Sequence, residues 1–288
     1  MNNTYEAPRF GPGGNSEAFY RAGKKSTKDA PAWVREIGLD AYEYEAGNGL
    51  SAGESSLRAV GDAARAAGIA MSFHTPYFIS LSSVEEEKRE KSVEYIRTSL
   101  QAAEWLGART IVVHCGSAGK ISREEAMRLA ADTLDRALTR LPDNGVLIGI
   151  ETMGKKNQLG TLDEVLTLCT ASPRLVPVVD FGHLNARDLG GVFCTAEDYT
   201  RLFDTVATRL SDGVARYMHC HFSKIEWTAA GEKRHLTFAD EVYGPAYEPF
   251  CEALARDHLC PTVICESAGT QSEDALAMKM AFLAANSK

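Results

Sequence analysis

The chain has 288 residues, of which 44% are hydrophobic, and a formal net charge of −8 at pH 7. This length falls short of two full domains and suits one barrel of about 250 residues built from alternating strands and helices. The acidic balance excludes a protein that holds nucleic acid by bulk charge alone, so a polyanion would have to be met by local basic loops.

The N-terminal stretch MNNTYEAPRF lacks the basic start and apolar run of a signal peptide. No segment offers the roughly 20 consecutive apolar residues that a membrane span needs. The seven cysteines are scattered and form no CxxC pair, which favours reduced thiols over a disulfide framework. We therefore expect a cytoplasmic, monomeric protein that makes no contact with a membrane.

Eight short apolar runs recur along the chain, and each is followed by a longer helical pattern. Their apolar density is typical of parallel strands that are buried on both faces. The first run is glycine-rich (RFGPGGN) and precedes a short or irregular helix. The runs span residues 9–14, 41–45, 70–77, 110–117, 146–152, 176–183, 216–223 and 262–269.

The helical patterns between these runs carry recognisable start signals. The pattern over 85–108 opens with acidic residues, which suit a helix N-terminus. The pattern over 122–141 opens with Ser122 and places Glu125 three residues later, as in a capping box, and the last helix begins in the same way at Ser272. Strand followed by helix, eight times, predicts an α/β fold: a closed (β/α)₈ TIM barrel, as a single domain over 1–288.

Metal-binding residue types gather where the predicted strands end, which is where this fold places its chemistry. A barrel directs side chains from different strands into one mouth, and converging imidazoles and carboxylates would face desolvation and like-charge costs that divalent cations remove. Mixed nitrogen and oxygen donors suit zinc, with manganese or iron as alternatives. The residues are His74, His114, Glu151, Asp180, His183, His219, His221 and Glu266, with His235 in the loop after the seventh strand.

Each of these residues also has an ordinary structural interpretation. Glu151 and Glu266 could be partners in salt bridges, and Asp180 could cap a helix. All of these interpretations would have to hold together in six successive units, which favours the metal site. In the stretch YMHCHFSK, alternation puts His219 and His221 on one face and Cys220 on the other. The alternate-facing cysteines, Cys115, Cys220 and Cys265, are therefore expected to pack as small hydrophobes.

Six motifs resemble the endonuclease IV family of apurinic/apyrimidinic endonucleases, which are xylose isomerase-like barrels. They are HTPYFISL, VVHCGS, IGIETMGK, VVDFGHLNAR, HFSK and ICES, and they run in the family's order from the third strand to the end. The resemblance implies a DNA-repair hydrolase whose metal cluster, usually three zinc ions, cuts the DNA backbone on the 5′ side of an abasic site.

The resemblance also implies a ligand set. Glu151 would bridge two ions and serve as the catalytic base. The stretch HFSK selects His221 as a ligand and leaves His219, two residues deeper, to orient a ligand. His74 and His114 would hold the first ion, Asp180, His221 and Glu266 would complete the second, and His183 and His235 would hold the third.

Two departures from the family pattern stand out. Lys233 occupies the place of an aspartate two residues before the last metal-binding histidine, and an ammonium group offers no lone pair. The third ion is then weak or absent, or Glu232 substitutes, or Lys233 holds a substrate phosphate. In the region after the second strand the family has an arginine, whereas this chain has Glu43 and Glu45, and an acidic loop there would repel DNA.

Candidate substrate contacts follow from the same motifs. Tyr77 keeps the aromatic position that enters DNA near the lesion in the family, although simple packing at the barrel rim is the alternative. Basic residues after strands five to seven would meet phosphate, unless they form a solvated rim: Lys155, Lys156, Arg187, Lys224, Lys233 and Arg234.

Two main hypotheses remain from the sequence. The first is a hydrolase of abasic DNA, favoured by four imidazoles beyond those that one ion requires. The second is a sugar or sugar-phosphate isomerase or epimerase, favoured by the acidic second loop and by Lys233. In the second case one ion would be held by Glu151, Asp180, His221 and Glu266. A non-enzymatic metal sensor or store is a third hypothesis, and it predicts saturated coordination.

Overall fold

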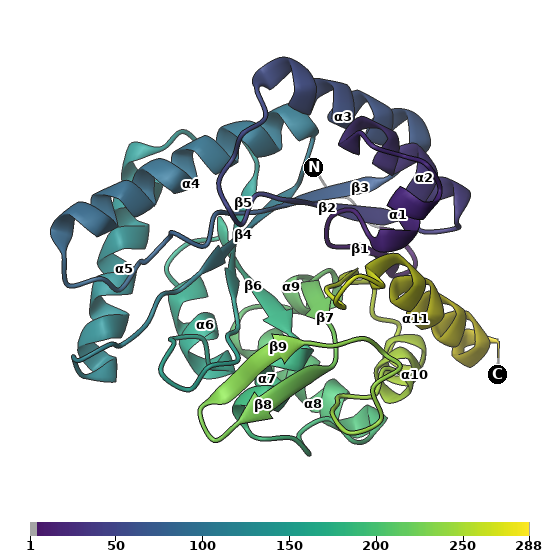
Figure 1. The fold of residues 1–288 in the computed structure, drawn as a ribbon. Coiled ribbons are helices and arrows are strands. Elements are labelled where there is room, and N and C mark those ends of the chain that lie inside the picture. The colour runs from purple at the N-terminus through teal and green to yellow at the C-terminus, as the bar shows by residue number, and fades with distance from the viewer. Residues whose placement is uncertain (1–4, 288) are drawn as a thin grey trace.

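The computed structural model describes residues 5–287, and residues 1–4 and 288 of the expected domain lie outside the described part. Eight parallel strands form one curved sheet surrounded by helices (Figure 1), which confirms the predicted (β/α)₈ fold. Around the sheet the strands follow the order β1-β10-β7-β6-β5-β4-β3-β2. They are β1 (Arg9–Pro12), β2 (Ala41–Glu45), β3 (Ala70–His74), β4 (Thr110–His114), β5 (Leu147–Glu151), β6 (Leu175–Asp180), β7 (His219–Phe222) and β10 (Thr262–Cys265).

The glycine-rich first strand closes the barrel against β2. Gly13 forms a parallel bridge with Glu43, and the Gly14 amide donates to the Glu43 carbonyl at 3.0 Å. A methyl group at Gly11 would lie 1.8 Å from the carbonyl oxygen of Ala41, so only glycine permits this approach. The glycine-rich run over 9–14 is therefore the segment at which the barrel closes, although it looked like the least regular unit in the sequence.

Helices fill the intervals between the strands. Ser122 caps its helix by accepting from the Glu125 amide at 3.1 Å, as expected. The last helix begins after Thr270, so the cap expected at Ser272 is wrong, and that hydroxyl instead contacts Ser16 at 2.5 Å. The helices are α1 (Glu17–Arg21), the 3₁₀ turn η1 (Thr27–Asp29), α2 (Ala30–Glu36), α3 (Glu54–Ala67), α4 (Glu86–Leu106), α5 (Arg123–Arg140), α6 (Leu162–Cys169), α7 (Phe181–Arg187), α8 (Ala196–Arg209), α9 (Asp212–Arg216), α10 (Glu248–Arg256) and α11 (Gln271–Asn286).

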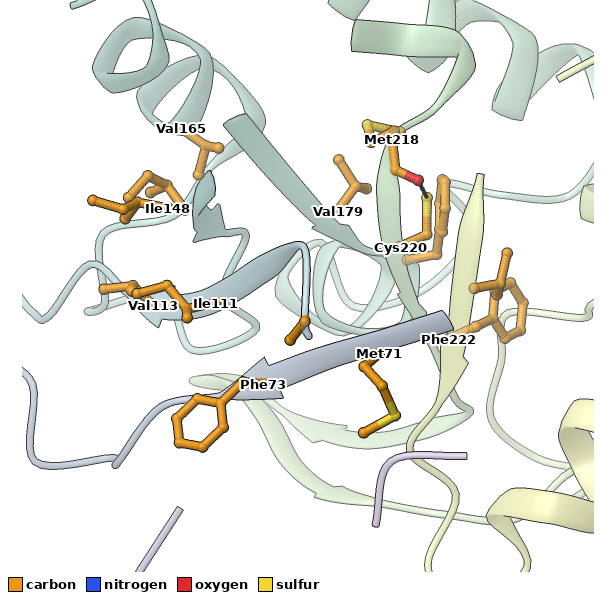
Figure 2. Close-up of a cluster of buried hydrophobic side chains, with 14 of the residues drawn as sticks. Met71, Phe73, Ile111, Val113, Ile148, Val165, Val179, Met218, Cys220 and Phe222 are labelled. Atoms are coloured by element: carbon orange, nitrogen blue, oxygen red, sulfur yellow. Dashed lines mark hydrogen bonds between the residues drawn. The ribbon is translucent and has the colours of Figure 1, made fainter. Parts of the chain in front are cut away.

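The hydrophobic core lies between the strands and the helices. Figure 2 shows Ile111 and Val113 of β4, Phe73 of β3 and Cys220 of β7 within this layer. Side chains alternate along each strand, so the neighbouring positions point into the barrel. The three alternate-facing cysteines, Cys115, Cys220 and Cys265, are free and fully buried in this core, as expected. Because these cysteines point toward the helices, the polar residues next to them in the sequence point into the barrel.

A two-stranded antiparallel hairpin follows β7, where the sequence suggested only a loop. It consists of β8 (Ile225–Thr228) and β9 (Gly231–His235), and it forms its own small sheet beside the barrel (Figure 1). The hairpin is tied to the loop after β5, because the Glu232 amide donates to the Gly154 carbonyl at 3.0 Å. Among residues 5–287, no helix combines the length and apolar character that a membrane span requires.

Candidate metal centre at the carboxyl ends of the strands

The predicted ligand residues converge on one end of the barrel. Parallel pairing places His114 opposite Glu151 and Asp180 opposite His221, so strand ends bring these side chains to the same level. Five groups result in which the donor atoms lie within 4.8 Å of one another. Two of them contain Glu43, namely Glu43, His219 and His221, and Glu43, Glu45 and Glu266. The other three are the groups that make up the candidate metal centre. They are His74, His114 and Glu151; Glu151, Asp180, His221 and Glu266; and His183, Glu232 and His235.

Glu151 joins the first two groups. Its Oε2 lies 2.9 Å from His114 Nε2 and 3.7 Å from His74 Nε2, while its Oε1 lies 3.0 Å from His221 Nδ1. Burial alone would raise the pKa of this carboxyl, but His114 and His221 hold its pKa well below the ordinary value. One buried carboxylate therefore offers an oxygen to each group, which is the arrangement that a bridging ligand requires.

Backbone carbonyls orient two of the imidazoles. His74 Nδ1 lies 2.9 Å from the carbonyl oxygen of Thr75, and His183 Nδ1 lies 2.9 Å from that of Thr152. A carbonyl only accepts, so each Nδ1 carries a hydrogen, and Nε2 is the nitrogen that can bind a cation once it has released its own proton. Metal-binding histidines are held in this way by their second nitrogen.

Asp180 combines a structural contact with an unused oxygen. Its Oδ1 accepts from the backbone amide of His183 at 2.7 Å and caps α7, so the capping interpretation is correct for this oxygen. Its Oδ2 is buried and has no hydrogen-bond partner among the described residues. A carboxylate oxygen left unpaired in the interior is costly. Together with the oriented imidazoles, this orphaned oxygen fits a bound cation.

The charges within the centre are strongly perturbed. Burial raises the pKa of Glu266 to about 8, with Glu151 and Asp180 adding to the rise and His221 opposing it. For His74, burial would lower the pKa, but Glu45 and Glu151 outweigh it and raise the pKa to about 10. Without a metal, Glu266 and His74 therefore bind protons near neutral pH, and these protons reduce the repulsion between the carboxylates. A divalent cation would take the place of these protons.

The third group includes Glu232 rather than Lys233. Glu232 pairs with Trp227 and Arg234 pairs with Glu226, so Lys233 is an extra residue at a register shift in the hairpin. An extra residue in one strand changes which side chains share a face. Glu232 thereby joins His235, and its Oε2 lies 3.5 Å from His183 Nε2.

A glycine gives Glu232 the room it occupies. A methyl group on Gly154 would lie 2.6 Å from the Glu232 Cβ and 2.8 Å from its Oε2. The loop after β5 and the hairpin therefore fit together only because residue 154 has no side chain. Of the alternatives that the sequence left open, substitution by Glu232 is the one that the geometry favours.

Three of the basic residues predicted to bind phosphate are engaged elsewhere. Lys233 Nζ lies 2.6 Å from Glu226 Oε1, and Arg234 Nε lies 2.7 Å from Glu226 Oε2, on the exposed hairpin. Lys224 donates to the carbonyl of Phe238 at 3.0 Å. The structure does not bring these three groups to the metal centre, and their role in substrate binding remains a prediction.

The remaining basic residues lie on the loop after β5 or against it. Lys155 and Lys156 are exposed on this loop. Arg187 is largely buried, and its guanidinium donates to carbonyl oxygens of the loop, including that of Met153 at 3.0 Å. Arg187 therefore fixes the loop, while Lys155 stays available at the rim.

Tyr77 stands at the mouth beside the first group. Its ring centroid lies 5.4 Å from those of His74 and His114, yet 56% of the residue is exposed. The Tyr77 amide donates to the Gly47 carbonyl at 3.0 Å, and a methyl group on Gly47 would lie 2.3 Å from the ring. The ring is thus positioned by the loop after β2 and presents a free face to solvent.

The prediction that Glu43 lies in an acidic loop after the second strand is wrong. Glu43 belongs to β2, and alternation turns its side chain into the barrel, where it is fully buried and contacts His219 and His221. Glu45 Oε1 is likewise buried. Glu45 lines a mouth cavity of about 400 Å³ together with Tyr77 and Glu266. Glu43 therefore presents no charge to an approaching phosphate backbone, and its part in the centre was missed from the sequence.

Comparison with known proteins places this geometry in a family. Residues 31–285 match the family described as xylose isomerase-like TIM barrel. An uncharacterized protein of Methanocaldococcus jannaschii is 30% identical over 248 residues, covering 85% of this chain and 88% of the relative. A probable endonuclease 4 of Acholeplasma laidlawii is 33% identical over 94 residues, or 32% of each chain.

Solved structures resemble the whole barrel. A D-tagatose 3-epimerase-like protein superimposes with a TM-score of 0.73 at 18% identity, over 97% of this chain and 98% of the other. Endonuclease IV from Thermus thermophilus superimposes with a TM-score of 0.65 at 19% identity, over 96% and 98%. At these identities the likeness shows the fold alone. The matched residues and the shared barrel architecture show that the chain belongs to the xylose isomerase-like TIM barrel family.

Proposed function

We propose that the protein is a metal-dependent phosphodiester hydrolase that incises DNA on the 5′ side of abasic sites. The observation that carries this proposal is the surplus of donors around Glu151. A single cation is satisfied by the four residues of the second group, yet two further groups adjoin it. Sites that hold two or more divalent cations are typical of enzymes that cleave phosphodiesters.

The residues of the three groups would hold the cations. Glu151 would be shared between the first two, and Glu232 would take the place of the family's aspartate in the third. Bound cations would supply a lowered pKa for water and positive charge for phosphate oxygens. The mixed imidazole and carboxylate donors suit zinc, with manganese or iron as alternatives.

Two rim residues would meet the DNA. The exposed face of Tyr77 lies beside His74 and His114, where an aromatic ring can stack on a base or fill the gap left by a missing one. Lys155 on the loop after β5 would meet a backbone phosphate. Because Glu43 is buried inside the barrel, Glu45 is the one of these two acids that still lines the mouth and counts against a phosphate backbone there. Cytoplasmic location and a monomeric state remain predictions.

A carbohydrate epimerase is the second candidate, and specific observations favour it. Burial raises the pKa of Glu45 to about 7 and that of Glu266 to about 8. Carboxyl groups with such values move protons efficiently near neutral pH. Both residues line the mouth cavity of about 400 Å³, which suits a small sugar. One cation on the second group would serve this reaction.

One experiment separates the two. The protein is purified without chelator, reconstituted with zinc, manganese or iron, and incubated with an end-labelled duplex that carries a single tetrahydrofuran abasic analogue. We expect one cut on the 5′ side of the analogue and none in the matched intact duplex. Glu151→Gln should abolish the cut, whereas Lys91→Gln, which changes an exposed lysine on the helix α4, should leave it unchanged. Absence of incision with every metal, together with turnover of a ketohexose, would refute the hydrolase and support the epimerase.

A further inference from the structure

Glu43 links two histidines across the interior of the barrel. It extends from β2, while His219 and His221 extend from β7, and β1 and β10 separate these strands in the sheet order. Glu43 Oε2 lies 2.9 Å from His219 Nε2, and Glu43 Oε1 lies 2.8 Å from His221 Nε2. Glu43 and His221 are fully buried, and His219 is 7% exposed.

The two nitrogens of His221 face different partners. Its Nδ1 lies 3.0 Å from Glu151 Oε1 and 3.3 Å from Glu266 Oε1, both members of the second metal group. A neutral imidazole has one nitrogen with a lone pair and one with a hydrogen. If Nδ1 binds a cation, the hydrogen must lie on Nε2, and the acceptor in contact with Nε2 is Glu43 Oε1.

We propose that Glu43 is a positioning residue for the metal centre: it fixes His221 as the tautomer with a hydrogen on Nε2, so that Nδ1 binds the cation, and His219 holds Glu43 in place. The Nε2–Oε1 contact is not aligned as a hydrogen bond, and neither atom has another partner among the described residues. A cation on Nδ1, with the hydrogen on Nε2, would give both of these atoms a partner.

Glu43 differs from the groups that orient the other imidazoles. His74 and His183 donate to neutral backbone carbonyls. His221 faces a carboxylate, which makes the opposite nitrogen a stronger donor to a metal. The inference depends on the second group, which both candidate functions share, and not on the choice between DNA and sugar.

His219 is the outer end of this chain of contacts. It lines a cavity of about 690 Å³ at the N-terminal end of the barrel, together with Ser72 and Thr262. Because the ring of His219 borders this open space, its ring nitrogens have one hydrogen-bond partner among the described residues, which is Glu43. Ser72 lines the same cavity and belongs to none of the three metal groups, so it provides a matched control.

The test measures zinc binding rather than turnover. We expect Glu43→Gln to weaken zinc at the second group by about 10–100-fold, the loss typical of outer-shell partners, in competition with a chromogenic chelator. The number of ions bound at saturation should not change. His219→Asn should weaken zinc less and in the same direction, and Ser72→Ala should leave it unchanged. In the zinc-loaded wild type, ¹⁵N NMR should show the His221 hydrogen on Nε2.

Three results would overturn the proposal. Unchanged zinc affinity in a folded Glu43→Gln variant would remove the role of the carboxylate. Loss of one full ion at saturation would mean that Glu43, His219 and His221 hold a cation themselves. A hydrogen on Nδ1 of His221 in the zinc-loaded wild type would contradict the proposal without any substitution, even if the variants fail to fold. Incision of abasic DNA is assayed separately, so failure here does not decide the substrate.

Discussion

Replacing Glu232 tests whether this residue, which the hairpin places beside His183 and His235, is a ligand in the third metal group. Glu232→Gln keeps the shape of the side chain and removes its charge, which leaves His183 and His235 as the donors of that group. Lys233→Gln is the matched control, since Lys233 is the adjacent residue and stands where the family's ligand is expected. The two variants differ by one position on the same strand, β9.

The structure sets the expected sizes of the two effects. Glu232 is 14% exposed, and its carboxylate faces His183 at 3.5 Å, so its loss should weaken the third ion by at least about 100-fold, or about 2.8 kcal/mol. Lys233 is 53% exposed and pairs with Glu226 on the surface, where such pairs contribute roughly 0.2–1 kcal/mol to stability. Its loss should leave metal content unchanged.

The assay is metal stoichiometry by mass spectrometry after dialysis against buffered zinc, with thermal unfolding as the check on folding. Glu232→Gln should lose one ion per chain and keep the others. Lys233→Asp, which restores the family's carboxylate, should bind no additional ion, because the register shift turns residue 233 toward Glu226. Normal zinc content in Glu232→Gln, or an ion lost in Lys233→Gln, would refute this reasoning.

Three further predictions follow from the same geometry. Glu151→Gln should remove the ions of both groups that share this residue and lower turnover by more than about 100-fold, with an unchanged circular dichroism spectrum; two ions retained would contradict the bridge. In the metal-free protein His74 has a pKa of about 10 and Glu266 one of about 8, so both carry protons at pH 7 that a cation must displace. Zinc binding should therefore release protons and tighten between pH 7 and 9, as measured by calorimetry in buffers of different ionisation enthalpy; affinity independent of pH would be evidence against this. Gly11→Ala should destabilise the protein by about 3 kcal/mol or more in urea unfolding, because the new methyl group would lie 1.8 Å from a carbonyl oxygen of β2, whereas Gly213→Ala, exposed within the helix α9, should not.

The barrel and the convergence of its ligands were predictable from the sequence. Buried parallel strands are continuous apolar runs, and all eight runs became strands. Because the carboxyl ends of a barrel's strands share one rim, residues that end neighbouring strands, such as His221 and Glu266, were expected to lie near one another. Local patterns were sufficient for this part of the prediction.

The contacts between residues that lie far apart in the sequence were not predictable in this way. The choice of Glu232 over Lys233 depends on one extra residue in a hairpin, and an alternation rule applied to the sequence selects the wrong neighbour of His235. Glu43 shows the same limit. The sequence interpretation assigned Glu43 to an acidic loop facing the substrate, whereas its contacts with β7 depend on how the barrel closes.

The most direct test of the account is a crystal structure of the zinc-reconstituted protein with anomalous scattering recorded at the zinc edge. The account predicts anomalous peaks at the carboxyl ends of the strands, one of them between the imidazoles of His74 and His114 and Glu151, and another against Asp180, His221 and Glu266. An end of the barrel without such peaks, in which these side chains pair only with one another or with other protein groups, would contradict it.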